Sequence, residues 1–178
     1  MPDRAHIVSA QLAPYFSAGQ QLLEIGAGEG HVADALRQAT GAHLTLVDVV
    51  DYNHTALPLH TYDGQSLPFA DGAFDISLLV FVLHHTPNPL VVLREALRVA
   101  RSGVVIVENH VEGRWRRPLT RAIDSIPHYR WGVPVCYHSN TVVEWQALFE
   151  CTGARVELLS HFAMNGGFWQ NVIMRVTA

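Results

Sequence analysis

The sequence of 178 residues contains no lysine, two cysteines and no long hydrophobic run. All twelve basic residues are arginine, and the net charge of -4 gives no electrostatic reason to expect a nucleic-acid partner. The longest apolar stretch, Ile76 to Leu83, is too short to span a bilayer, so no membrane span is expected. The first residues lack the basic and apolar regions of a signal peptide.

The low cysteine content bears on the redox environment of the protein. Cys136 and Cys151 occur without an export signal, which favours reduced thiols in a cytoplasmic protein, with a single structural disulfide as the minor alternative. Hydrophobic residues make up 49% of the chain and charged residues 16%, a balance that fits a globular fold and argues against a disordered chain. The length suits one domain covering residues 1–178.

Strand and helix patterns alternate along most of the chain, which predicts an α/β fold. The predicted helices cover 4–17, 31–39, 89–100 and 141–151, and the predicted strands cover 22–25, 43–47, 57–61, 74–83, 104–108, 155–160 and 171–176. No helix separates the last two strands, so they are expected to pair as a hairpin. The expected architecture is a Rossmann-like, doubly wound, mostly parallel seven-stranded sheet with an antiparallel last strand.

Three glycines on alternate positions, Gly26, Gly28 and Gly30, follow the first predicted strand. Glycine accepts positive φ and lets the backbone approach a ligand closely, so this segment predicts a tight turn at a binding site. Glu24 stands just before the turn, where it would repel a diphosphate and attract a cation. The pattern therefore favours a ligand that carries an ammonium or sulfonium group.

Two further acids are expected at the same sheet edge, where open α/β folds bind ligands. Asp48 ends the second strand, 22 positions after Gly26, and its carboxylate can accept hydrogen bonds from both hydroxyls of a ribose. Asp63 and Gly64 begin a turn-rich segment, where a carboxylate can accept from the exocyclic amine of adenine. The end of the fourth strand, Val80 to His85, would border the reacting centre.

These motifs together resemble a known family. Leu22 to Gly30 looks like motif I of the class I S-adenosylmethionine-dependent methyltransferases, and Asp48 stands where that family has its ribose-binding acid. Residues 63–75 resemble the segment with the adenine contact, and Leu83-His84-His85 resembles the motif after strand four. The pattern is most similar to small-molecule methyltransferases related to the ubiquinone and menaquinone pathway enzymes.

The resemblance implies S-adenosylmethionine as the cofactor and methyl transfer as the activity. Motif I would hold the methionyl part, Asp48 the ribose, and Asp63 with Gly64 the adenine. Val80 departs from the small polar residue often found at its place, so a side-chain hydrogen bond is lost there. The implied cofactor-binding residues are Glu24, Gly26, Ala27, Gly28, Asp48, Val49, Asp63, Gly64 and Val80.

Residues 111–138 lack a clear periodicity and are expected to form a lid that shapes the acceptor pocket. Their aromatic residues favour an aromatic or apolar small-molecule acceptor, and their arginines are interpreted as a solvated face, with capture of an acidic substrate as the alternative. The candidate substrate-binding residues are His110, Tyr137 and His138. Cys136, His128 and His138 do not supply a full ligand set at zinc spacing, so no metal is expected.

His85 is the candidate catalytic residue, whereas His84 is expected to pack in its loop. A hydroxyl acceptor would need a base, with His85, His110 and His138 as the choices, while a carbon or sulfur acceptor would need none. One alternative function is a non-catalytic S-adenosylmethionine-binding partner or regulator. The other is a nicotinamide-dependent oxidoreductase, which is disfavoured because its third glycine would fall at His31. The short leader leaves room for a partner or a homodimer to close the pocket.

Overall fold

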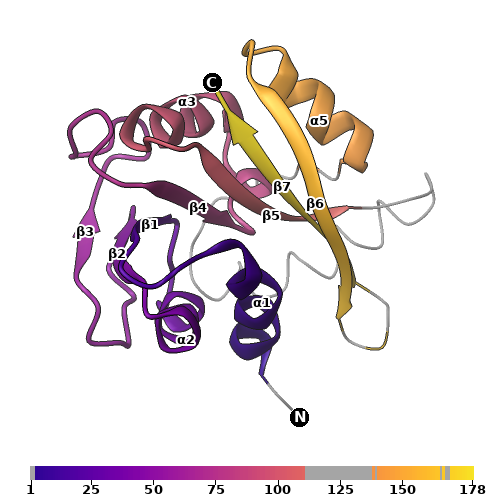
Figure 1. Cartoon of the computed structure of the whole chain (residues 1–178). Helices are drawn as coiled ribbons and strands as arrows, with labels where there is room; N and C mark the ends of the chain where they lie inside the picture. The colour runs from indigo at the N-terminus through magenta and orange to yellow at the C-terminus, as the bar shows by residue number, and fades with distance from the viewer. Residues whose placement is uncertain (1–2, 111–137, 139, 165, 167–168) are drawn as a thin grey trace.

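The computed structural model describes residues 3–110, 138, 140–164, 166 and 169–178. Seven strands form one sheet in the order β3-β2-β1-β4-β5-β7-β6, which confirms the predicted fold class (Figure 1). The strands are β1 Gln21–Ile25, β2 His43–Asp48, β3 Leu59–Thr61, β4 Ile76–Val80, β5 Val104–His110, β6 Arg155–Met164 and β7 Trp169–Thr177. The helices are α1 Arg4–Leu12, α2 His31–Thr40, α3 Pro89–Val99 and α5 Val142–Glu150, with short 3-10 turns at Ala13–Tyr15 and Leu83–His85.

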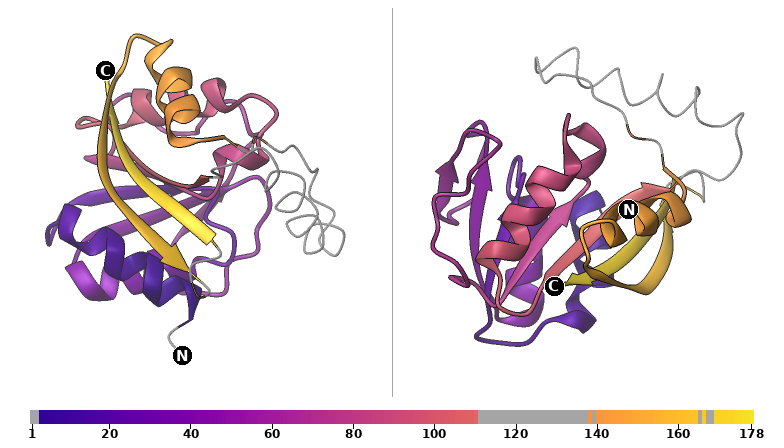
Figure 2. Two further views of the ribbon diagram at one scale, coloured as in Figure 1. Left: turned by 90° about the vertical axis from the view of Figure 1, so that its right-hand side faces the viewer. Right: turned by 90° about the horizontal axis from the view of Figure 1, so that it is seen from above.

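Helices cover both faces of this sheet, α1 and α2 on one side and α3 and α5 on the other (Figures 1 and 2). Each face has its own apolar core, because the central strands carry buried side chains in both directions. Trp145 and Phe149 of α5 pack into one core, while Val8 and Leu12 of α1 pack into the other. Among the described residues, no helix is long and apolar enough to cross a membrane.

The last two strands form the expected hairpin, and β7 lies between β5 and β6. It pairs antiparallel with both neighbours, whereas the strands from β3 to β5 are all parallel. The carboxyl ends of β1, β2 and β4 therefore meet at one edge of the sheet, on which the site is built.

The fourth strand is shorter than its apolar run predicts. The pattern predicts a strand over 74–83, but β4 ends at Val80 because Phe81 takes a φ of 58°, a conformation that a strand does not accommodate. The chain then enters the 3-10 turn Leu83–His85. The prediction for 81–83 was wrong, since apolar composition does not report backbone direction.

The leading helix is also shorter than predicted. It runs from Arg4 to Leu12, and Ala13 to Tyr15 tighten into a 3-10 turn that contains Pro14, which cannot donate a helical hydrogen bond. The third strand begins at Leu59 instead of at residue 57.

Candidate active site

The glycine loop connects β1 to α2, and all three glycines have positive φ, at 73°, 54° and 78° for Gly26, Gly28 and Gly30. The Gly26 N–H donates to the Val47 carbonyl at 2.8 Å, which fixes the loop to the end of β2. A Cβ at Gly26 would lie 2.6 Å from the Val82 side chain, whereas a Cβ at Gly28 would meet no atom within 4 Å. The loop is thus packed tightly at its start and open to a ligand at its middle.

Two adjoining pockets of about 440 and 350 Å³ lie along this edge of the sheet and share Gly26, Phe81 and His85. The first has a charged wall and is lined by Asp3, Arg4, Ala5, Glu24, Gly26, Ala27, Glu29, Gly30, His31, Val32, Val80, Phe81 and His85. The second is mostly apolar and is lined by Gly26, Gly28, Asp48, Val49, Val50, Tyr52, Tyr62, Gly64, Phe81, Val82, His85, Thr86, Pro87 and Val92. Eight of the nine predicted cofactor residues line one pocket or the other.

Glu24 supplies the unusual electrostatics of the first pocket. Glu24 is 2% exposed, and its Oε2 has no hydrogen-bond partner among the residues that the structure describes. Burial raises the pKa of Glu24 to about 8; the nearby Asp48 carboxylate adds to the shift, and the Ala33 backbone N–H opposes it. A cation in this pocket would offset the cost of burying the charge.

Asp48 is held in place by the backbone at the end of β2. Its Oδ2 accepts from the Gly28 N–H and its Oδ1 from the Val49 N–H, both at 2.7 Å. Each carboxylate oxygen has a second lone pair. The side chain is therefore oriented toward the second pocket with acceptor capacity to spare, as two ribose hydroxyls require.

Asp63 is the predicted cofactor residue that does not line either pocket. Its Oδ1 accepts from the Gln65 and Ser66 N–H groups, each at 2.8 Å, and these bonds lower the pKa of Asp63. Its neighbours Tyr62 and Gly64 line the second pocket instead. In this structure the carboxylate holds a turn whose backbone forms part of the wall.

His85 lines both pockets, and a buried pair lies behind it. Its ring centroid lies 3.8 Å from that of His84, whose Nδ1 lies 2.5 Å from Oε2 of Glu108. The other Glu108 oxygen accepts from the Leu83 N–H at 2.7 Å. His84 packs in its loop as expected, and through it the end of β5 supports the loop that carries His85.

Of the three candidate substrate residues, the structure describes His110 and His138. His110 ends β5, is buried and makes an edge contact with His161, and it lines neither pocket. The His138 N–H donates to the His84 carbonyl at 3.2 Å, which places residue 138 beside the loop of His85. Tyr137 and the rest of the expected lid lie outside the described residues.

Two features of the pockets carry no signal in the sequence, the contribution of Arg4 and the positive φ of Phe81. Arg4 comes from α1, and its guanidinium carbon lies 4.4 Å from the centre of the Phe81 ring. Phe81 is the non-glycine residue with positive φ in the described chain, and it lies between the two pockets. Backbone strain of this kind is common at functional sites, and the sequence alone does not reveal it.

Comparison with known proteins gives related sequences. Residues 23–107 match a family model described as a methyltransferase domain. An uncharacterized methyltransferase of Mycobacterium marinum is 32% identical over 123 residues, covering 65% of this chain and 48% of that protein. Another, from Mycobacterium tuberculosis, is 31% identical over 122 residues, covering 64% and 47%. The chain thus spans about half the length of the curated relatives it matches.

Solved structures resemble the fold over nearly the whole chain. The YcgJ protein of Bacillus subtilis superposes with a TM-score of 0.71 at 16% identity, covering 96% of this chain and 97% of that one. An S-adenosylmethionine-dependent methyltransferase of Aquifex aeolicus gives 0.71 at 17% identity, covering 100% and 94%. At these identities the likeness shows the fold alone. The sequence matches support the resemblance to methyltransferases, whereas the tie to ubiquinone and menaquinone enzymes has no such support.

Proposed function

We propose that this protein transfers a methyl group from S-adenosylmethionine to a small, aromatic or apolar molecule. The buried Glu24 carboxyl in the wall of the first pocket carries the proposal, because a cation there relieves its desolvation. The family model over residues 23–107 adds independent support.

The two pockets fit the two halves of the cofactor. The first would take the methionyl part, with Glu24 facing its cationic groups and Arg4 its carboxylate. The second would take the adenosine, with Asp48 on the ribose and the apolar wall of Val49 and Tyr62 beside the base. Gly28 leaves open space where the ligand must approach the backbone.

When bound, S-adenosylmethionine supplies an already activated methyl group on a sulfonium. The task left to the protein is to align the acceptor, exclude water and, for a hydroxyl acceptor, remove a proton. His85 lines both pockets and is the residue proposed for that proton transfer. The aromatic residues of 111–138 are proposed to bind the acceptor on sequence grounds.

Calorimetry with S-adenosylmethionine, its demethylated product and a nicotinamide dinucleotide tests the cofactor. We expect binding of the first two and none of the third. Asp48→Ala should weaken binding by about tenfold or more, since a hydrogen bond to a charged group is worth about 1.5–3 kcal/mol. Asp51→Asn, on an exposed carboxylate of the same loop, is the matched control.

The results separate the alternatives. Binding of the dinucleotide alone would contradict the proposal. Tight binding of S-adenosylmethionine with no transfer of labelled methyl to any of a panel of phenols, amines and thiols would favour the non-catalytic alternative.

A further inference from the structure

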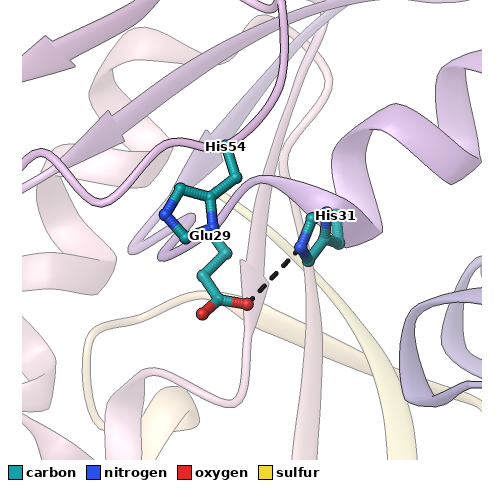
Figure 3. A group of neighbouring side chains, drawn as sticks. All are labelled: Glu29, His31 and His54. Atoms are coloured by element: carbon teal, nitrogen blue, oxygen red, sulfur yellow. Dashed lines mark ion pairs between the residues drawn. The ribbon is translucent and has the colours of Figure 1, made fainter.

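We propose that Glu29, His31 and His54 form a site for a divalent transition-metal cation of the Zn²⁺ type. Figure 3 shows the three side chains together, Glu29 and His31 from the glycine loop and the start of α2, and His54 from the segment between β2 and β3. One ligand atom from each residue lies within 4.8 Å of the others, and His31 Nε2 lies 3.5 Å from Glu29 Oε2. Zinc bonds of about 2.0–2.2 Å place neighbouring ligands roughly 3–4 Å apart. Small side-chain movements would therefore complete the site.

The backbone already holds the two segments together. The His54 N–H donates to the Glu29 carbonyl at 3.1 Å. The Asn53 side chain accepts from the Thr55 N–H at 2.9 Å and donates to the Leu57 carbonyl at 2.8 Å, which fixes the turn around His54. A bound ion would need to order three side chains and no backbone, which reduces the entropic cost of binding.

The packing at Gly30 brings these segments into contact. A Cβ at Gly30 would lie 2.8 Å from Asn53 Oδ1 and 3.1 Å from Thr55 Oγ1, so glycine at this position lets the segment of His54 approach the loop. The third glycine of the motif thus has a role in placing the three candidate ligands, in addition to its role at the turn.

The donor set selects the type of ion. Two imidazoles and one carboxylate suit Zn²⁺ and its neighbours in the first transition row, whereas Mg²⁺ and Ca²⁺ prefer oxygen ligands alone. All three residues are exposed, so a hydrated ion can reach them, and three protein ligands leave a coordination position for water. Sequence patterns miss this set because His54 is far along the chain from Glu29 and contact depends on the fold.

The candidate metal site lies at the rim of the first pocket. Glu29 and His31 also line the first pocket, so a bound ion would add positive charge at the rim of that pocket. Metal binding itself does not depend on the proposed methyl transfer, and it can be measured without any cofactor or acceptor.

Titration with Co²⁺, followed by visible absorption and by competition with Zn²⁺, tests the site. We expect one equivalent to bind with d–d bands of nitrogen and oxygen ligands. His54→Gln and Glu29→Gln should each weaken binding by about tenfold or more. His43→Gln, an exposed histidine at the start of β2, should bind like the parent. Thermal unfolding shows whether each variant is folded. His54→Gln is the clearer of the two tests, because His54 lies outside the glycine loop and its replacement leaves that loop unchanged.

The same titration can overturn the proposal. Absence of the d–d bands in the parent protein, or bands that His54→Gln and Glu29→Gln leave unchanged, would exclude this site. A thiolate charge-transfer band as the sole signal would assign the binding to a cysteine such as the exposed Cys151 instead.

Discussion

The carboxyl group of Glu24 is the buried acid in the wall of the first pocket. With a pKa of about 8, Glu24 is largely protonated at neutral pH in the folded protein. A cation entering the pocket would favour the ionised form, since it replaces the solvation that burial removed. Binding of a cationic ligand should therefore be accompanied by proton release from this residue.

The stability of the ligand-free protein should depend on pH through Glu24. The unfolded chain ionises this group near 4.5 and the folded protein near 8, so between these values the folded state holds more protons. The contribution of Glu24 to the free energy of unfolding is fully present below about pH 4.5. It is lost as the pH rises to about 8, at up to about 1.4 kcal/mol per pH unit. Denaturant unfolding of Glu24→Gln at pH 5, 7 and 9 should show a shallower decline than the parent.

The control for this prediction is Glu150→Gln, which changes an exposed carboxylate at the end of α5. It should keep the parental pH dependence. Equal slopes in Glu24→Gln and the parent would mean that Glu24 is ionised in the folded protein, and the electrostatic argument for a cationic ligand would fail.

At the scale of elements, the loop after β4 depends on a buried contact with β5. Glu108 accepts from the Leu83 N–H with one oxygen and contacts His84 with the other. Because the His84 ring lies against that of His85, the orientation of His85 depends on a carboxylate that touches neither pocket. We therefore expect Glu108 to act as a positioning residue for His85.

Glu108→Gln should disturb His85 as well as stability. The oxygen of the glutamine amide can still accept a hydrogen bond from the Leu83 N–H. The NH₂ group of the amide cannot accept a hydrogen bond from His84 Nδ1. We expect a loss of about 1–3 kcal/mol in unfolding free energy and a changed His85 ring signal in NMR spectra. Glu95→Gln is the matched control. The Glu95 carboxylate also links two segments, since it accepts from the Leu67 N–H and from Arg98 of its own helix, and it lines neither pocket. An unchanged His85 signal in Glu108→Gln would leave Glu108 with a structural role only.

At the scale of the whole molecule, the features that local sequence determines were the predictable ones. Glycine accepts positive φ, and Gly26, Gly28 and Gly30 all have it. The missing helix between the last strands predicts the hairpin that β6 and β7 form. Local chemistry was sufficient in both cases.

Other features depend on contacts between distant segments, and these escaped prediction. The apolar run continues past Val80, so nothing in the pattern reveals that Phe81 turns the chain. The contact of Glu108 with His84 and that of His54 with Glu29 exist only because the sheet order brings their segments together. The lid expected over residues 111–138 stays a prediction, because residues 111–137, including Tyr137, lie outside the described part of the chain.

The placement of both pockets leads to a prediction for the whole chain. Their lining residues all fall between residues 3 and 92, whereas the hairpin of β6 and β7 contributes none. S-adenosylmethionine should therefore slow hydrogen exchange at short labelling times, when local openings dominate, in residues 26–31, 48–52 and 81–87. The hairpin should be unchanged at those times and slow only at long times, because ligand binding also stabilises the folded state as a whole, by about 2.7 kcal/mol at a hundredfold excess over Kd. Mass spectrometry of peptides measures both regimes, and Asp48→Ala should weaken both effects at the same ligand concentration. Early protection confined to the hairpin would place the ligand away from the sheet edge on which the site is built.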